Sequence, residues 1–371
     1  MYSQNEIDEA VAAGALSADA AAALRAHIEN QRSLPTQDEE QFRLITGFND
    51  IFVAIAAAIL LFAVGFIGQW IGQQTGLVAG ESDGPSFLAP LFVAATSWGL
   101  ALFFTAKRRM ALPSILLLLA FVGSVFVTAG FALVQAIGPE PLENSKVLAP
   151  MLGSLAAAVA AVAAWLHWKR FMVPITVAAG AASVAAIVVG LVVAALGQDL
   201  EQAENVILGL VLVLGVGTFL FAMWWDGSDR ARLTRRSDVA FWLHLLAAPM
   251  IVHPVFTLLG LNDGTATVGE GLVVIALYIA IGFTALAIDR RALLVSALAY
   301  VLFALNRMFE QFGAVELNVA LTALVIGSAL LMLSAFWHQA RTSVVKTLPS
   351  GLRERLPLTE RSTGAIPQPA A

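Results

Sequence analysis

The chain of 371 residues contains no cysteine, and that absence excludes several kinds of chemistry. Without a thiol there can be no disulfide, no thiolate nucleophile, no zinc–thiolate centre and no iron–sulfur cluster. Charged residues are also scarce: they make up 13% of the chain, whereas a soluble globular protein carries about 25%. This shortage is expected if most of the surface faces lipid, because a bilayer core disfavours ionised side chains.

Common catalytic and nucleotide-binding motifs are missing as well. The chain has no GxxxxGK followed by Ser or Thr, no GxGxxG after a strand, no HExxH and no GxSxG. Its five histidines are scattered and lack the spacing of metal ligands. We therefore expect no cofactor, no bound metal, no nucleic-acid partner and no catalytic residues.

Apolar sequence is what the chain has in abundance, with 59% hydrophobic residues and a mean hydropathy of +0.81. Apolar runs of about 18 or more residues predict spanning helices. We expect about ten spans, at residues 48–72, 87–106, 111–137, 147–167, 171–197, 205–225, 239–260, 269–288, 292–312 and 315–337. The predicted fold is an all-α, polytopic transmembrane helical bundle that contacts the lipid bilayer.

Short basic turns separate alternate pairs of these runs. Nineteen of the 21 Lys and Arg residues lie in the N-terminal region, in the C-terminal tail, or in turns at 107–109, 169–170, 230–236 and 290–291. The loops on the other side are acidic, and Lys146 is their only base. Because basic loops remain in the cytoplasm, both termini are predicted to be cytoplasmic.

The turns belong to a pattern of paired helices. Leu88-Ala89-Pro90 opens the second run and Leu148-Ala149-Pro150 opens the fourth, while Pro113 and Pro174 each follow a basic turn. Prolines suit the first turn of a helix, and glycines suit its end. Such glycines occur near the acidic ends of the runs, at positions 72, 138, 197, 260 and 313. The pattern predicts five tandem helical hairpins, which arose by duplication or through the shared constraints of a hairpin.

The two ends of the chain differ from this membrane domain, which is expected at residues 47–338. Residues 1–46 predict a small cytoplasmic helical region, with Gly14 ending one helix and Ser17 capping the next. Two short helices cannot bury a core alone, so we expect them to pack on each other, on the membrane portion or on a cytoplasmic protein partner. Residues 339–371 predict a cytoplasmic tail that is largely disordered.

One candidate site lies inside the membrane domain. His253, in a run with two prolines, has a predicted depth similar to that of Asn306, Arg307 and Glu310. If the seventh and ninth spans are neighbours, these four residues form one polar pocket. The competing interpretation is an interfacial salt bridge between Arg307 and Glu310, with His253 as a packing residue. His167, His244 and His338 are expected near the inner interface without a special role.

The N-terminal segment also resembles a known family. Ile7 to Ser17 has the pattern of an apolar residue, an acid, and then Gly-x-Leu-Ser, and Phe42-Arg43 leads to Gly47-Phe48-Asn49-Asp50 at the first span. This arrangement is similar to a family of uncharacterised bacterial polytopic membrane proteins, of the domain of unknown function 2157 type. The resemblance implies a bacterial inner membrane location and no known activity.

Three classes of function are compatible with these features. We expect a membrane scaffold or sensor whose N-terminal region docks on a partner. The alternative is a transporter of a small molecule or lipid, through a cavity near the seventh and ninth spans. An intramembrane enzyme is the least expected, because ionisable groups at membrane depth are few.

Overall fold

The computed structural model describes most of the chain. The described residues are 11–24, 48–79, 83–197, 200–230, 232, 234–260, 268–291, 293–294, 298, 301–302, 318–354 and 356–357. The chain divides into two compact units, Met1–Arg43 and Leu44–Ala371. All regular secondary structure within the described ranges is helical, as expected for an all-α protein.

The smaller unit contains helical residues at 11–12 and 18–24. Gly14 has a φ of +73°, and Ser17 Oγ accepts a hydrogen bond of 3.1 Å from the backbone N–H of Ala20. Both observations confirm the predicted helix stop and helix cap. Ala21 is fully buried in this unit, whereas Leu24 is exposed.

The larger unit contains helices with the length and composition of membrane spans. Within the described residues, six helices qualify: α3 (Phe48–Thr75), α5 (Ala111–Ile137), α7 (Leu148–Phe171), α8 (Ile175–Leu196), α9 (Leu200–Gly227) and α10 (Arg235–Leu258). A seventh results if α13 (Asn318–Ala335) and α14 (Trp337–Thr347), which meet at a 76° bend, form one span. These helices are typical of a membrane protein.

Four helices remain. They are α4 (Leu88–Phe104), α6 (Pro139–Glu143), α11 (Val268–Ile288) and α15 (Ser350–Arg353). Nearly all the predicted spans overlap a described helix, and α4, with 17 residues, is short for a full crossing. The predicted span at 292–312 lies largely outside the described residues, so the count of ten stays a prediction.

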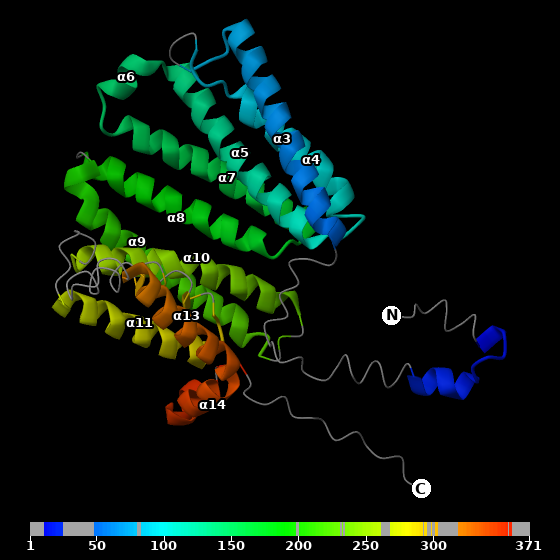
Figure 1. Ribbon diagram of the computed structural model, residues 1–371. Helices are drawn as coiled ribbons and strands as arrows, with labels where there is room; N and C mark the ends of the chain where they lie inside the picture. The colour runs from blue at the N-terminus through cyan, green and yellow to red at the C-terminus, as the bar shows by residue number, and fades with distance from the viewer. Residues whose placement is uncertain are drawn as a thin grey trace. The chain divides into compact units, whose positions relative to one another are not determined.

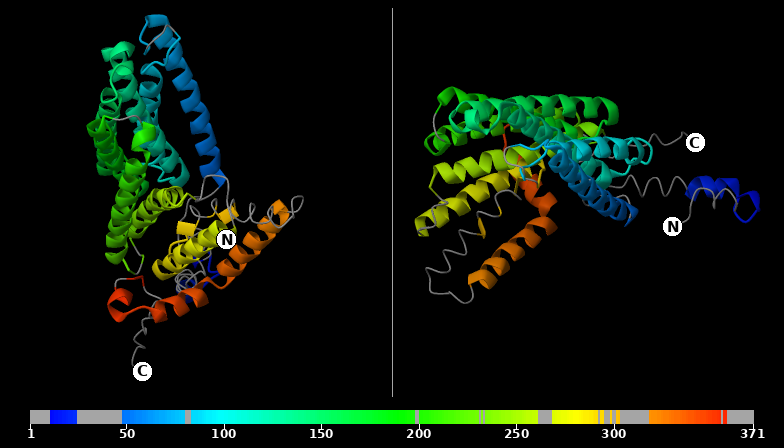
Figure 2. Two further views of the ribbon diagram at one scale, coloured as in Figure 1. Left: turned by 90° about the vertical axis from the view of Figure 1, so that its left-hand side faces the viewer. Right: turned by 90° about the horizontal axis from the view of Figure 1, so that it is seen from above.

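The helices pack mainly on their neighbours in sequence. α3 contacts α4 and α5, α5 contacts α7, α7 contacts α8, and α10 packs on both α8 and α9 (Figure 1). Side chains of α11 and α14 form a core with α9 and α10, and two further views show this group beside the α9–α10 pair (Figure 2). We call the end with the turns at 105–110, 172–174, 228–234 and 289–291 the basic end, and the opposite end the acidic end.

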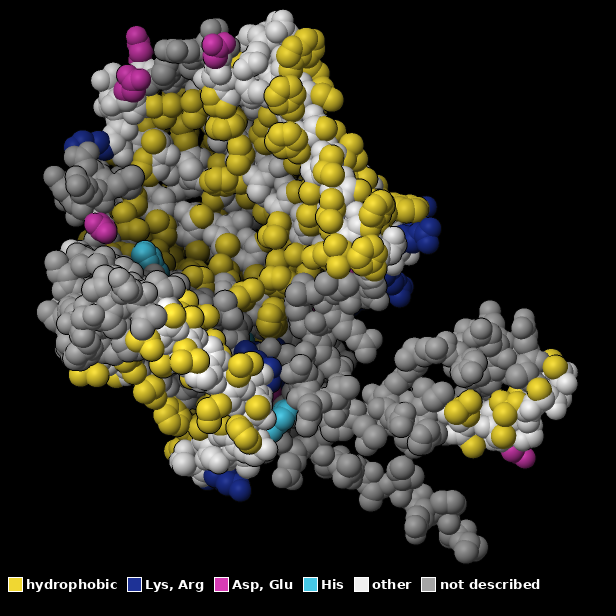
Figure 3. All heavy atoms as spheres, in the orientation of Figure 1, with side chains coloured by type: hydrophobic (Ala, Val, Ile, Leu, Met, Phe, Trp, Pro, Cys, Tyr) yellow, Lys and Arg dark blue, Asp and Glu magenta, His cyan; other side chains and the backbone are white. Residues whose placement is uncertain are grey.

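The outer surface of these helices is strongly apolar. Phe48 is 82% exposed, Phe62 78% and Leu331 73%. Apolar side chains cover much of the visible face, whereas the coloured acidic and basic groups are few and lie mainly toward its margins (Figure 3). Exposed apolar area on this scale is unusual for a soluble monomer and is expected when lipid is the solvent.

Small residues fill the contacts between helices. Ala156, Ala160 and Ala164, which recur every fourth residue along one face of α7, are all buried. A Cβ atom on Gly68 of α3 would lie only 2.6 Å from the backbone oxygen of Leu88, at the start of α4. Close backbone approach at small residues is the usual means of packing helices in lipid.

The two ends of the helices use different residues for the same backbone turn. At the acidic end, Gly76, Gly138, Gly197 and Gly260 have φ between +58° and +85°. At the basic end, the residues with positive φ are Arg109, Met172, Arg232 and Asp289, with φ between +53° and +58°. The predicted caps at 138, 197 and 260 are confirmed in conformation, whereas Gly72 lies inside α3 and Gly76 takes its expected place.

Candidate functional site: a buried charge cluster at the basic end

A buried ion pair connects the end of α9 to the residue that follows α11. Arg290 donates from Nε to Asp226 Oδ2 at 3.1 Å and from Nη2 to Asp226 Oδ1, so the pair is bidentate. Asp226 is 1% exposed and Arg290 is 2% exposed. Bidentate guanidinium–carboxylate pairs are strong and directional, so the pair fixes the end of α11 against α9.

Helix α10 completes the surroundings of this pair. Arg290 Nη2 donates to the carbonyl oxygen of Ser237 at 3.1 Å, and His244 Nε2 lies 3.4 Å from Asp226 Oδ2. The ring of Phe219 packs edge-on against the imidazole of His244, with centroids 5.2 Å apart. The ionic group therefore has apolar walls, and few water molecules can screen it.

A second branch of the cluster is centred on Asp289. Its Oδ2 accepts a hydrogen bond from Arg232 Nη1 at 2.7 Å, and its Oδ1 accepts one from Trp337 Nε1 at 2.7 Å. Arg341 Nε lies 3.7 Å from the same Oδ1. Asp289 has a φ of +58°, and this left-handed turn places its carboxylate beside three donors from other segments.

The charge cluster also holds the start of the C-terminal tail. Arg341 donates from Nη2 to the carbonyl oxygen of Pro357 at 2.8 Å, and Arg230 donates from Nε to that of Leu356 at 2.9 Å. The side chains of Trp337, Arg341 and Val345 are buried along α14. Residues 337–357, for much of which disorder is expected from the sequence, are thus folded where the structure describes them.

The cluster suits a structural joint better than a catalytic centre. Its carboxylates and guanidinium groups neutralise each other away from solvent. Asp229 separately holds the N-cap of α10, because its Oδ2 accepts hydrogen bonds from the backbone N–H of Thr234 at 2.8 Å and from the Thr234 hydroxyl at 2.7 Å. Within the described residues, no group of three or more His, Cys, Asp or Glu could hold a metal ion. The arrangement ties the ends of α9, α10, α11 and α14 together.

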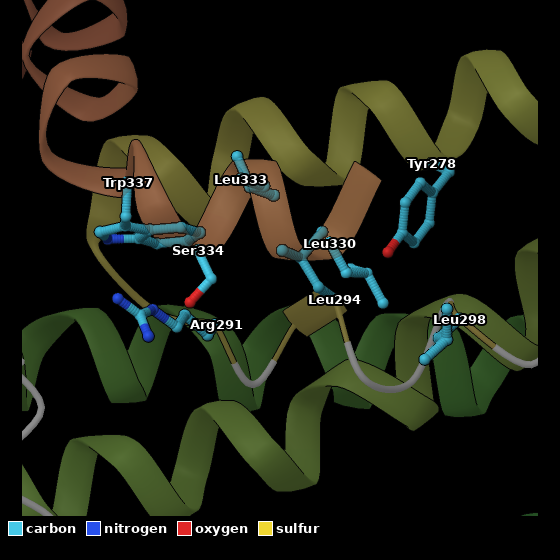
Figure 4. A pocket seen from close by; sticks show the side chains of 8 residues that line it. All are labelled: Tyr278, Arg291, Leu294, Leu298, Leu330, Leu333, Ser334 and Trp337. Carbon is cyan, nitrogen blue, oxygen red and sulfur yellow. The ribbon is translucent and has the colours of Figure 1, made fainter. Parts of the chain in front are cut away.

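A small pocket lies next to this joint, between α11, α13 and the residues after Arg290. It has a volume of about 160 Å³. The guanidinium of Arg291 lies over the ring of Trp337, 4.8 Å from its centroid, at one end (Figure 4). The hydroxyl of Tyr278 points in from the other end and has no hydrogen-bond partner among the described residues. The walls between them are four leucines and Ser334.

A larger apolar cleft separates α10 from α11. Its volume is about 320 Å³. Ile251 and Val255 of α10, Leu277 and Ala280 of α11, and Leu293 line it with other apolar residues. Phe219 lines the same cleft and contacts His244, so the cleft adjoins the charge cluster. A cavity of this size and lining can accept a small apolar molecule or part of a lipid chain.

The polar pocket predicted from the sequence is only partly within the described residues. His253 is exposed on α10, on a helix face different from that of the buried Val252 and Pro254. Asn306, Arg307 and Glu310 lie outside the described residues. The pocket of four polar residues therefore stays a prediction.

Two histidines expected at the interface are instead fully buried. His167 lies among Trp98, Phe121 and Phe171, and its Nδ1 is 3.3 Å from Thr176 Oγ1. His244 belongs to the charge cluster. Aromatic and charged neighbours cover both imidazoles, which the sequence did not indicate, and their expected position near the inner interface stays a prediction.

The remaining residues of the cluster were missed in the sequence. The sequence does contain one indication of the cluster. Aspartates occur next to the basic turns, at positions 226, 229, 238 and 289, although the other acidic residues of the membrane domain lie mostly in the loops at the opposite end. Comparison with family models, with curated proteins and with solved structures gave no match.

Proposed function

We propose that the protein is a multi-pass membrane scaffold or sensor, with a charge-locked joint on its cytoplasmic side and an N-terminal region that docks on a partner. The observation that supports this proposal is the buried cluster around Asp226, Arg290 and Asp289, which unites four helices and the tail. Such a joint would keep the ends of the four helices, and the surface that they form, in a single fixed arrangement. A scaffold needs a fixed surface, and a sensor needs an element that can be released.

The proposed orientation follows from charge. The basic turns would lie in the cytoplasm and the acidic loops on the other side of a bacterial inner membrane, as the positive-inside rule favours. The resemblance of residues 7–17 to a bacterial membrane family supports the same location. In this orientation the charge cluster, the smaller unit and the C-terminal tail share the cytoplasmic side.

Photo-crosslinking from the smaller unit tests the docking role. Leu24 is exposed, and Ala22, two residues earlier on the helix, points to a different side. A benzophenone amino acid at position 24 is expected to give one discrete crosslinked product in intact membranes, whereas position 22 gives none. Equal yields from both positions, or no product from either, would contradict a docking face at Leu24.

A second function is favoured by the cleft between α10 and α11. Its apolar lining and its position against candidate spans suit a carrier of a lipid or an amphipathic small molecule. Ala280 is exposed and lines the cleft, so phenylalanine at this position fills the space without displacing a core residue.

Flux through liposomes tests the carrier function. If the cleft is the route, purified wild-type protein moves a fluorescent lipid across the bilayer, and Ala280→Phe abolishes that movement. Ala276→Phe is the matched control, because Ala276 is exposed on the same helix and is not among the lining residues. Absence of flux with the wild-type protein would dismiss the carrier and leave the scaffold proposal untouched.

A further inference from the structure

The small pocket between α11 and α13 contains a polar group that no neighbour satisfies. The hydroxyl of Tyr278 is shielded from solvent and points into the pocket, and it has no hydrogen-bond partner among the described residues (Figure 4). A buried polar group without a partner costs stability, so its presence calls for an explanation. A bound molecule that accepts a hydrogen bond from this hydroxyl would supply one.

The position of the hydroxyl along α11 makes solvent a poor substitute for that partner. Tyr278 lies ten residues before Ile288, where α11 ends, and is thus about 15 Å from the basic end at 1.5 Å per residue. This distance is about half the thickness of a bilayer core. If α11 crosses the bilayer, as residues 269–288 predict, the hydroxyl lies near the middle of the hydrocarbon, where bulk water is absent.

The walls next to the hydroxyl do not suit an isolated water molecule either. They are formed by leucines, and the other polar side chains of the lining, Arg291 and Ser334, lie at the opposite end (Figure 4). A buried water molecule needs about two to four polar partners. The Tyr278 hydroxyl is the one polar side-chain group of the lining at its end. An occupant therefore has to bring an apolar body together with its acceptor.

The volume of the pocket limits the size of that body. It is about 160 Å³, and an engineered protein cavity of about 150 Å³ with apolar walls binds benzene. The rings of Tyr278 and Trp337 border the two ends of the pocket. Aromatic rings in contact stabilise each other beyond the area that they bury. The pocket therefore fits one aromatic ring with a short substituent.

The same surroundings exclude a charged group or a phospholipid at the hydroxyl. A carboxylate or an ammonium group there would lie among leucines without a counter-charge. The guanidinium of Arg291 lies at the far end, over the ring of Trp337, and has no part in the contact with the hydroxyl. Acyl chains offer no acceptor, and the ester carbonyls of phospholipids lie outside the hydrocarbon core.

We propose that this pocket binds an uncharged, membrane-soluble aromatic molecule, with its one hydrogen-bond acceptor at the Tyr278 hydroxyl and its ring between the leucines. Aromatic ketones and aldehydes have this chemistry. The pocket shares no lining residue with the cleft between α10 and α11. The binding therefore does not rest on the scaffold, sensor or carrier functions.

Fluorine NMR of the full-length protein, labelled with 5-fluorotryptophan in detergent micelles, tests the site. The probes are acetophenone and ethylbenzene, which have similar shapes but differ in the carbonyl acceptor. Acetophenone is expected to shift the resonance of Trp337, which is identified by its loss in Trp337→Phe, and the titration gives a dissociation constant for each probe. If Trp337→Phe does not fold, the rise in unfolding temperature with each probe gives the same comparison.

Replacing Tyr278 with phenylalanine removes the hydroxyl and keeps the ring. Tyr278→Phe should weaken acetophenone binding about fivefold, the equivalent of ~1 kcal/mol for one neutral hydrogen bond. Ethylbenzene binding should not change. Comparing the two probes cancels their different partitioning into the micelle, because both proteins are measured in the same detergent.

The stability of the same variant distinguishes a ligand-binding hydroxyl from a structural one. Without a probe, Tyr278→Phe should be at least as stable as the wild-type protein, because it removes a buried polar group that lacks a partner. A hydroxyl with a structural partner would lose a hydrogen bond instead. A lower unfolding temperature of Tyr278→Phe without a probe would therefore contradict the proposal.

Narrowing the pocket tests its location. Ser334 is exposed and lines the pocket, so Ser334→Leu adds volume there without replacing a core residue and should weaken the binding of both probes. Ser328→Leu is the matched control, because Ser328 is exposed on the same helix and is not among the lining residues. It should bind both probes as the wild-type protein does, and unfolding temperatures show whether each variant is folded.

Three further results would overturn the proposal. The first is a Trp337 resonance that acetophenone does not shift while it shifts other tryptophan resonances, since the probe would then occupy a different cavity. The second is an equal effect of Tyr278→Phe on both probes, including no effect on either. The third is tighter binding of benzoate than of acetophenone, which would identify an anion as the occupant.

Discussion

Replacing Arg290 with methionine is expected to lower the free energy of unfolding by about 3–5 kcal/mol, because it leaves the buried carboxylate of Asp226 without its bidentate partner. The methionine side chain fills similar space but offers no donor. The expected loss is a large fraction of the stability of a typical protein. Equilibrium unfolding of the purified protein in detergent micelles measures the change.

A matched pair of variants separates the lost ion pair from a general effect of charge removal. Lys107→Met removes an exposed base from another basic turn and should change stability by no more than about 0.5 kcal/mol. The double variant Asp226→Leu with Arg290→Met removes both charges and should recover most of the loss, as in other proteins with buried ion pairs. Equal small losses for Arg290→Met and Lys107→Met would show that the cluster is not a desolvated joint.

The second large effect is expected at the contact between α9 and α10. A Cβ atom on Gly215 would lie 2.8 Å from the backbone carbon of Met250 and 2.9 Å from its oxygen. That carbonyl lies four residues before Pro254, which has no N–H to donate to it, so the close approach occurs where α10 lacks its usual helical hydrogen bond. Gly215→Leu should therefore push the helices apart and cost about 3 kcal/mol or more.

Gly217 provides the control in the same helix. A Cβ atom at this position meets nothing within 4 Å, so Gly217→Leu adds the same side chain facing open space. Its stability should equal or slightly exceed that of the wild-type protein, because leucine favours helix more than glycine does. If both variants lose the same stability, the α9–α10 contact does not depend on the glycine.

Hydropathy and turn residues were sufficient to predict most helix positions. The predicted span 111–137 coincides with α5, and the predicted starts near Pro150 and Pro174 lie within a turn of the observed starts of α7 and α8. These features are local: a long apolar run, a proline that tolerates the first turn and a glycine that ends the last one. Each can be recognised without knowledge of the neighbouring helices.

The charge cluster could not be predicted in the same way. Asp226 and Arg290 are 64 residues apart, and they meet only because α11 returns to the basic end beside α9. In the sequence, Arg290 and Arg291 look like a basic turn that merely sets topology. His244 likewise looks like an ordinary interfacial residue until α9 covers it. Long-range pairing of helix ends decides which of these charges become buried.

At His253, by contrast, the sequence suggested a site on insufficient grounds. Similar depth in two spans is a weak criterion, because it fixes neither the rotation of a helix nor its neighbours. His253 is exposed on α10, while cavities occur between α10 and α11 and between α5, α7 and α8. Both cavities are lined mainly by apolar and small residues, which a search for polar groups in the sequence passes over.

The alternation of glycine and non-glycine residues in the left-handed turns has a consequence for how such a chain can lengthen. Consider a duplicated segment that runs from one helix-ending glycine to the next, such as from Gly138 to Gly197. It would include two helices and the turn between them, in which Met172 takes the left-handed conformation. The copy would need no new junction. Growth by such units adds two crossings at a time, so it leaves the tail on the side of the bilayer where it already was.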